Sequence, residues 1–181
     1  MPIEVTIIDT RTTAHWLAAV TRRDELEMTS AADMVDKVIA KLERTRERPP
    51  GNAPRTNTFD GMVAAKMSRL NILDHGNEDE LEIGDDVICT GAFARFRATF
   101  ARLTGRFAPG GFAHLQHCEA AMNIRLMEMF ADCWQVPVVA GRGAESTVYG
   151  INWGNYVRVH PVRPDGSRPR ADTYFWRFSA T

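Results

Sequence analysis

One histidine and one cysteine in this sequence each directly follow a short, mainly apolar segment. His75 comes after Arg-Leu-Asn-Ile-Leu-Asp (69–74), and Cys118 comes after Phe-Ala-His-Leu-Gln-His (112–117). A cysteine thiolate is a strong nucleophile, and a nearby imidazole takes up or delivers a proton. The two residues could therefore carry out acyl transfer through a thioester, provided that the fold brings their side chains together.

The residues next to this pair fit the same chemistry. Gly76 lets the backbone approach a substrate closely, and its N–H could form an oxyanion hole with the N–H of Cys118. We expect a helix to begin directly after Cys118 and to run to Trp134, so that its dipole favours a negative charge on the thiol. Glu119 stands at the same helix start and works partly against thiolate formation.

Strand-like and helical patterns alternate along the chain, which predicts an α/β fold. We expect a mainly parallel sheet flanked by helices on both faces. The expected strands cover residues 3–8, 69–74, 112–117 and 136–140. The expected helices cover residues 14–20, 29–45, 93–107 and 119–134, the second of them capped by Thr29 or Ser30 with Asp33 in its first turn.

The remaining segments are predicted to be irregular or antiparallel. Residues 46–57 contain three prolines and are expected to form an exposed loop, and residues 81–84 are expected to form a small hairpin. Alternating residues 156–160 and the aromatic segment 174–178 flank a Pro-Asp-Gly turn at 164–166. This pattern predicts a C-terminal antiparallel hairpin that extends one edge of the sheet or folds over it.

The predicted topology places His75 and Cys118 at one edge of the sheet. In an open parallel sheet, functional groups collect at the carboxyl ends of the strands. One crossover with one clear helix separates the two strands concerned, so we expect these strands to be neighbours. Adjacent strands lie about 4.8 Å apart, and the two side chains could then approach within several ångströms.

Length and composition indicate one globular domain over residues 1–181. The hydrophobic fraction is 44%, the charged fraction is 25% and the net charge is −1, so neither a nucleic acid nor an acidic membrane is an expected partner. No apolar run approaches the roughly 20 residues of a membrane span. The N-terminus reads as a strand and not as a signal peptide, and three cysteines form no disulfide framework. We expect a cytoplasmic protein; leaderless export and the oligomeric state stay open.

The segments Leu70–Gly76 and Phe112–Cys118 resemble the motifs of caspase-like (clan CD) cysteine peptidases. In that family a hydrophobic strand ends in His-Gly, and a helical crossover leads to a strand that ends in Cys. Toxin self-cleaving domains and CHAT-like members look closest, because they also carry an acidic, Gly-containing stretch after His-Gly, here residues 77–84. The resemblance covers about residues 66–160.

This resemblance implies a cysteine endopeptidase that acts on a protein or peptide and needs no cofactor or metal. His75 and Cys118 would be the catalytic dyad, and the backbone at Gly76 and Cys118 would form the oxyanion hole. Substrate-contacting residues would follow the strand after the cysteine helix. By position these are Gly141, Arg142, Gly143, Glu145 and Ser146.

Other interpretations remain open on the sequence alone. His117 stands where many family members have a small residue, and a bulky side chain there would narrow the site or mark a non-catalytic, caspase-like binding or regulatory module. A metal site that uses His114 and His117 is disfavoured, because residues three apart on a strand face opposite sides. A flavodoxin-like ligand-binding domain is disfavoured too, because residues 9–13 contain no glycine. Cys89 and Cys133 are expected to be core residues.

Overall fold

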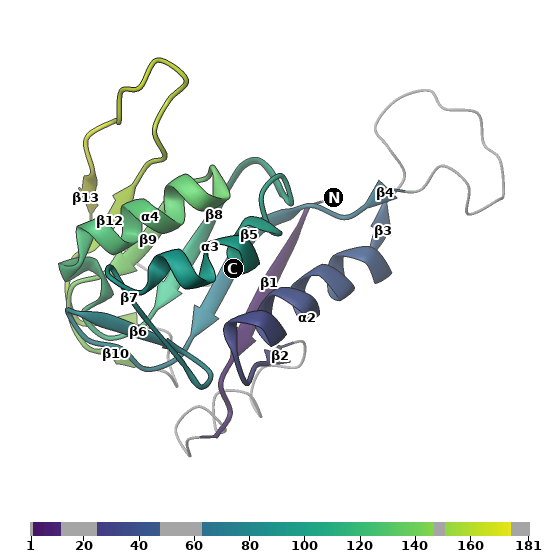
Figure 1. Cartoon of the computed structure of the whole chain (residues 1–181), viewed down its shortest axis with the longest axis horizontal. Coiled ribbons are helices and arrows are strands. Elements are labelled where there is room, and N and C mark those ends of the chain that lie inside the picture. Colours follow the sequence, from purple (N-terminus) through teal and green to yellow (C-terminus); the bar gives the residue numbers. More distant parts are fainter. Residues whose placement is uncertain (1, 12–24, 48–62, 147–150, 175–181) are drawn as a thin grey trace, which may run out of the picture.

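A computed structural model describes residues 2–11, 25–47, 63–146 and 151–174 of the chain. Its main feature is a seven-stranded sheet with the strand order β13-β12-β9-β8-β5-β1-β2 (Figure 1). The strands of this sheet are β1 (Ile3–Ile8), β2 (Leu26–Glu27), β5 (Met67–Leu73), β8 (Phe107–Gln116), β9 (Val138–Gly141), β12 (Tyr156–Val159) and β13 (Asp172–Tyr174). The strands from β2 to β9 in this order are parallel to their neighbours, so the predicted α/β class and mainly parallel sheet are confirmed.

The C-terminal strands form the predicted antiparallel pair at one edge of the sheet. Strand β12 runs antiparallel to both β9 and β13. The turn between them is closed by two backbone hydrogen bonds, from Gly166 N–H to Arg163 O (2.9 Å) and from Arg163 N–H to Ser167 O (2.8 Å). Residues 175–178 of the predicted hairpin lie outside the described residues.

The three described helices pack side by side on one face of the sheet (Figure 1). They are α2 (Ala31–Arg44), α3 (Phe93–Ala101) and α4 (Ile124–Trp134). Helices were expected on both faces, and the structure therefore bears out this expectation for one face only. The helix predicted for residues 14–20 lies outside the described residues.

Helix α2 begins as its sequence predicts. Ser30 is the N-cap, and its hydroxyl accepts a hydrogen bond from the N–H of Asp33 (3.1 Å). In return, the Asp33 carboxylate accepts one from the N–H of Thr29 (3.0 Å) and lies beside Lys37 (2.9 Å). Side chains thus satisfy one N–H of the first helical turn and the N–H of the residue before the N-cap.

The main core fills the space between the helices and one face of the sheet. Leu70 and Ile72 of β5 and Leu115 of β8 point into it and are fully buried. Asn71 and His114, which alternate with them, point to the opposite face. This second face is polar where Asn71 donates hydrogen bonds to Glu4 (2.6 Å) and Thr6 (3.0 Å). The central strands are therefore amphipathic and not apolar on both sides.

Helix α3 is shorter than its periodic phenylalanines predict. It ends at Ala101, and residues 102–106 form a tight turn in which Gly105 has φ +76°. Phe107 opens β8 and still joins the core, because a strand residue can fill the position that the helical pattern assigned to it. The predicted helix boundary at 107 is therefore wrong.

Strand β8 begins earlier than the expected strand 112–117 and contains a bulge. Met67 pairs with Phe107 and Arg69 pairs with Phe112, so residues 108–111 face a single residue of β5. Gly111 is required in this bulge, because a Cβ there would lie 2.8 Å from the Met67 carbonyl oxygen. Pro109 and Gly110 are the exposed residues of this bulge.

Three short antiparallel pairs complete the described structure. They are β3 (Arg46–Glu47) with β4 (Val63–Ala64), β6 (Glu80–Ile83) with β7 (Asp86–Cys89), and β10 (Glu145–Ser146) with β11 (Ile151–Asn152). The loop predicted for residues 46–57 therefore starts as a strand, and its residues 48–57 are not among those described. The predicted small hairpin is confirmed with wider bounds. None of the described helices is long and apolar enough to cross a membrane.

Candidate active site

Strand register places His75 and Cys118 at the same level on neighbouring strands. Strands β5 and β8 are adjacent and parallel, and Leu73 is the register partner of Gln116. His75 and Cys118 each follow this pair by two residues. The side chain of His75 is exposed, and that of Cys118 is partly exposed. The predicted adjacency of the two strands is therefore confirmed, and the dyad itself stays a prediction.

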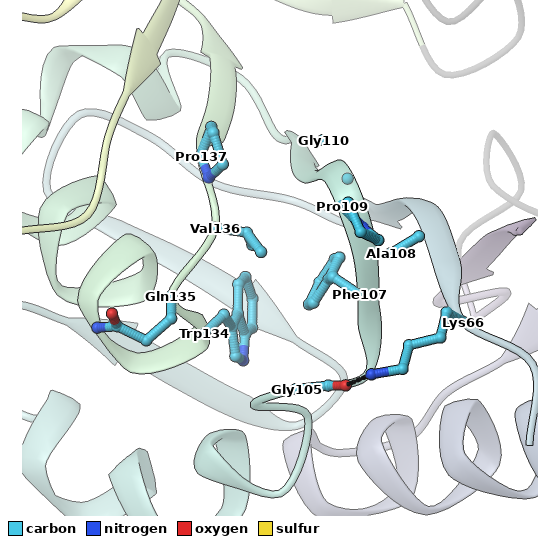
Figure 2. A pocket seen from close by; sticks show the side chains of 11 residues that line it. Lys66, Gly105, Phe107, Ala108, Pro109, Gly110, Trp134, Gln135, Val136 and Pro137 are labelled. Atoms are coloured by element: carbon cyan, nitrogen blue, oxygen red, sulfur yellow. Dashed lines mark hydrogen bonds between the residues drawn. The ribbon is translucent and has the colours of Figure 1, made fainter. Parts of the chain in front are cut away.

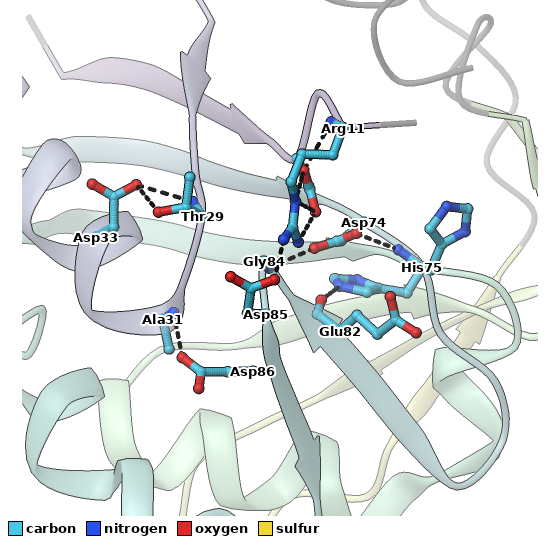
Figure 3. Close-up of polar contacts among 12 residues, drawn as sticks. Arg11, Thr29, Ala31, Asp33, Asp74, His75, Glu82, Gly84, Asp85 and Asp86 are labelled. Atoms are coloured by element: carbon cyan, nitrogen blue, oxygen red, sulfur yellow. Dashed lines mark hydrogen bonds and ion pairs between the residues drawn. The ribbon is translucent and has the colours of Figure 1, made fainter. Parts of the chain in front are cut away.

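The backbone at His75 is fixed by the buried side chain of Asp74. One carboxylate oxygen of Asp74 accepts the N–H of His75 (2.8 Å), and the other accepts the N–H of Gly84 (2.7 Å) in the turn of the β6–β7 hairpin. Figure 3 shows the His75 ring directed away from this carboxylate. The imidazole is therefore presented outward from a fixed main chain.

Gly76 lies between this hairpin and the end of β8. It faces Leu81 in an antiparallel bridge flanked by hydrogen bonds from Asn77 N–H to Glu80 O and from Glu82 N–H to His75 O, both 2.9 Å. In such a pair the central residue points its own N–H and C=O away from the opposite strand. The N–H of Gly76 is therefore directed away from β6, as an oxyanion-hole donor needs to be.

The chain after Cys118 differs from its prediction. Glu119 adopts a left-handed conformation (φ 56°), and only a short 3₁₀ turn, η1 (Ala120–Met122), follows it. Helix α4 begins at Ile124, where the side chain of Asn123 accepts the N–H of Leu126 (3.0 Å). The expected helix start at Cys118 is therefore wrong, and a helix dipole does not explain any activation of this thiol.

The thiol of Cys118 instead contacts the segment after β9. The N–H of Glu145 donates a hydrogen bond to Cys118 Sγ (3.3 Å), and the N–H of Glu119 donates one to Gly143 O (2.9 Å). Segment 141–145 therefore forms a wall beside the cysteine. This agrees with the region predicted to contact substrate, although contact with a substrate stays a prediction.

Asn152 organises this wall, and sequence reasoning missed it. Its side chain accepts hydrogen bonds from the N–H groups of Gly143 and Gly154 (both 2.8 Å) and donates one to Gly143 O (2.7 Å). It is 6% exposed, and its own N–H donates to the Tyr156 hydroxyl (3.1 Å). Gly141 is required for this packing, because a Cβ there would overlap the Asn152 amide. The only signal in the sequence was a set of glycines around an asparagine.

We expect Asn152→Ala to loosen the wall beside Cys118. The substitution leaves the N–H groups of Gly143 and Gly154 without their acceptor, and each such loss costs about 1–3 kcal/mol when the group stays buried. The rate of Cys118 alkylation should change about tenfold, since 1.4 kcal/mol corresponds to one decade. Mass spectrometry of alkylated peptides measures this rate. Asn155→Ala is the matched control, because no hydrogen bond of that side chain is found within the described part of the chain; an equal effect of both variants would contradict the role of Asn152.

The neighbouring residues of the wall occupy different positions. Arg142 is exposed and is held through its N–H, which donates to Asn155 O (3.0 Å). Gly143 packs against the backbone of Gly154, where a Cβ would lie 2.6 Å from the Gly154 nitrogen. Ser146 continues from Glu145 into β10. Four of the five residues predicted to bind substrate therefore lie in the wall beside Cys118, and Ser146 directly follows it.

His117 packs against the β6–β7 hairpin and next to Gly76. It is fully buried, and its Nε2 lies 2.9 Å from Glu82 O on the β6–β7 hairpin. His114 contacts a different element, with its ring centroid 5.6 Å from that of Tyr156. Burial, with smaller effects of Arg69 and His117, lowers the pKa of His114 to about 3, so its ring is neutral. In the described ranges, no three His, Cys, Asp or Glu side chains are grouped to hold a metal ion.

The other two cysteines lie in different surroundings. Cys133 is 8% exposed on α4, its Sγ donates to Arg97 O (3.6 Å), and burial raises the pKa of its thiol. Cys89 ends β7 and is partly exposed. The prediction of a core position is therefore confirmed for Cys133 and is wrong for Cys89, because the last residue of a hairpin strand is covered on one side only.

An open pocket of about 400 Å³ lies at the other end of the sheet (Figure 2). Phe107, Trp134 and Pro137 contribute to its lining, and the Lys66 ammonium at its rim donates to Gly105 O (2.5 Å). These residues lie near the amino ends of β5, β8 and β9, whereas His75 and Cys118 follow carboxyl ends. The pocket is therefore separate from the candidate site.

The candidate site thus consists of an exposed histidine, a partly exposed cysteine and a glycine-rich wall, all at the carboxyl edge of a parallel sheet. No model of a known protein family matches the chain, and no curated protein matches it. Its function is therefore inferred from the residues and the geometry of this site.

Proposed function

We propose that the chain is a caspase-like cysteine hydrolase, an endopeptidase in which Cys118 is the nucleophile and His75 is the general acid and base. The observation that carries this proposal is the strand register. Both residues stand two positions beyond the Leu73–Gln116 pair, at the edge where parallel strands present functional groups. The exposure of His75 and the partial exposure of Cys118 support access of a substrate to both.

The proposed reaction proceeds in two steps. The Cys118 thiolate attacks the scissile carbonyl carbon and forms an S–C bond, while the carbonyl electrons move to the oxygen. The oxyanion collapses, the C–N bond breaks, and the His75 imidazolium gives its proton to the leaving amine. Water, deprotonated by His75, then attacks the thioester, releasing the carboxylic acid product and returning the thiol.

Two backbone N–H groups would stabilise the oxyanion. The N–H of Gly76 points away from the β6–β7 hairpin, and in the described residues the N–H of Cys118 donates to no backbone carbonyl. Hydrogen-bond donors that are fixed before the reaction stabilise the developing negative charge without reorganising. This stabilisation lowers the activation free energy of acyl transfer substantially. The hydrogen bond from Glu145 N–H to Cys118 Sγ supports the thiolate in the same way.

Selective alkylation tests the proposal. We expect a panel of peptidyl acyloxymethyl ketones that differ in their first residue to modify Cys118 ahead of Cys89 and Cys133 in the folded protein. Peptide mapping by mass spectrometry identifies the modified thiol, and iodoacetamide, which has no peptide portion, is the control probe. Equal modification of Cys89 and Cys118 by every ketone would refute the peptidase assignment.

One observation favours the second candidate, a non-catalytic binding or regulatory module of the same fold. Glu145, whose N–H donates to Cys118 Sγ, has both carboxyl oxygens buried, and Glu119 is a second acidic residue directly after Cys118. Reactive cysteines usually lie in electropositive surroundings, which two acidic residues do not provide. This candidate predicts that Cys118 reacts with iodoacetamide no faster than an ordinary exposed thiol and that no peptidyl ketone improves on it.

A further inference from the structure

Asp74 is a buried carboxylate with two fixed hydrogen-bond donors. Asp74 is 3% exposed, and its two carboxylate oxygens accept hydrogen bonds from the N–H groups of His75 (2.8 Å) and Gly84 (2.7 Å). These donors lie on different segments, the end of β5 and the turn of the β6–β7 hairpin. Asp74 therefore joins the backbone of the candidate base directly to the hairpin.

The hairpin turn is fixed at further points around Asp74 (Figure 3). Arg11 lies between the carboxylates of Asp9 and Asp85 and pairs with both. The N–H of Asp85 donates to Thr29 O (2.9 Å), and the Asp86 carboxylate accepts the N–H of Ala31 (2.9 Å). The turn is thus a rigid support, and the bond between Gly84 and Asp74 transmits its position to His75.

Gly84 makes this close approach feasible. Its φ is +63°, and a Cβ at this position would overlap the backbone of Thr29. Only glycine fits a left-handed turn that touches a second backbone in this way. The N–H of Gly84 can therefore reach a carboxylate that is otherwise enclosed.

We propose that Asp74 is the positioning residue for His75 and Gly76, that its carboxyl oxygens hold this segment against the hairpin, and that protonation weakens the two hydrogen bonds that fix its position. The catalytic consequence rests on the proposed function. Asp74 itself does not face the outward-pointing imidazole, so it is not a catalytic residue (Figure 3).

The surroundings of Asp74 set the pH range of this effect. Burial raises its pKa to about 7; the hydrogen bonds from Gly84 and His75 lower it, and the charges of Asp9 and Glu82 raise it. The charged groups that act on its pKa are Asp9 after β1 and Glu82 of the hairpin. Around them, Arg11 pairs with Asp9 and Asp85, and His117 after β8 contacts the backbone of Glu82. The carboxylate form, which accepts both hydrogen bonds most strongly, should therefore predominate above neutral pH.

Backbone NMR of the full chain tests the hydrogen-bond part of the inference without any assumption about activity. We expect the amide resonances of His75 and Gly84 to titrate together with one midpoint near neutral pH, and to lose this titration in Asp74→Asn. Asp79→Asn is the control, because Asp79 is an exposed carboxylate in the neighbouring 77–80 turn. Separate midpoints for the two amides, or an unchanged titration in Asp74→Asn, would overturn the inference.

The positioning role has its own measurement. The rate of Cys118 alkylation by the best peptidyl ketone should fall about 10- to 100-fold in Asp74→Asn at pH 8, the size expected from a small displacement of a catalytic group. In Asp74→Asn, the acidic limb of the pH profile of this alkylation rate should also lose the component whose midpoint coincides with the Gly84 amide titration. If the wild type shows no selective alkylation, the proposed function fails while the NMR result still decides the hydrogen-bond role. Selective alkylation with an unchanged rate and pH profile in Asp74→Asn would instead refute positioning alone.

Stability provides an independent check with a definite sign. A carboxyl group whose pKa is raised in the fold binds its proton more tightly in the folded than in the unfolded chain. Its contribution to the free energy of unfolding is therefore lost as pH rises from its ordinary value of 3.8 to about 7. The urea midpoint of the wild type should decrease over this range more than that of Asp74→Asn, and parallel curves would count against the ionisation of Asp74.

Discussion

Replacing Cys118 by serine is expected to abolish hydrolysis of a pool of internally quenched peptides, with a loss on the order of 10⁴-fold or more. The hydroxyl is a far weaker nucleophile than a thiolate. His75 follows β5, which is the neighbour of the strand that precedes Cys118. His75→Ala should cause a loss of similar size, because the leaving amine then lacks its proton donor. The measurement is the rise in fluorescence per mole of folded protein at pH 7.5.

The double variant gives this prediction a second criterion. Residues that act as one catalytic unit are strongly non-additive, so Cys118→Ser combined with His75→Ala should lose little more than either single variant. Cys89→Ser is the matched control, because Cys89 is also partly exposed but stands at the end of β7. Peptide hydrolysis that persists within about tenfold of the wild type in Cys118→Ser would exclude this cysteine as the nucleophile.

Replacing Trp134 by alanine is expected to lower the free energy of unfolding by about 3–5 kcal/mol. Trp134 is fully buried and contacts Phe100 (centroids 5.9 Å apart) and Phe130 (4.8 Å) in the core beneath the helices. Its indole N–H also donates to Phe100 O (3.0 Å), an acceptor that the variant leaves buried without this donor. Urea unfolding followed by far-UV circular dichroism measures the change.

Trp153→Ala is the matched control for this loss. Trp153 is the same residue type but is 76% exposed in the turn after β11, so its removal should change the free energy of unfolding by less than about 0.5 kcal/mol. A similar loss in both variants would mean that Trp153 is covered in solution. A loss below about 1 kcal/mol in Trp134→Ala would contradict the position of the core.

Several parts of the fold followed from the sequence because their signals are local. The β-branched run at 3–8 is a strand, and Ser30 with Asp33 begins α2 where a capping pattern predicts it. The end of β5 before His75 and the neighbouring position of β8 followed from strand length and crossover length. These features depend on periodicity, hydrogen-bonding side chains and chain connectivity, which a short stretch of sequence contains.

Other parts depended on contacts between distant segments. The phenylalanines at 93–107 have helical spacing, yet Phe107 belongs to a strand because β5 offers it a partner at Met67. The start of α4 depends on Asn123, whose side chain also donates to Asp79 O (3.1 Å) on the distant hairpin segment. Periodicity indicates which face of a helix or strand is apolar. It does not indicate which distant segment will hydrogen-bond to the backbone of that element.

The sequence by itself determined the type of chemistry available and the edge of the sheet where it lies. His75, Gly76 and Cys118 follow predicted strands, and local patterns are sufficient to identify such strands. Only the tertiary structure decided how these residues are supported: Asp74 holds the backbone of His75, and Asn152 holds the wall that contacts Cys118. Each supporting side chain hydrogen-bonds a backbone group nine or ten residues away, Gly143 for Asn152 and Gly84 for Asp74. Every residue other than proline has such a backbone group, so no residue type in the sequence marks the partner.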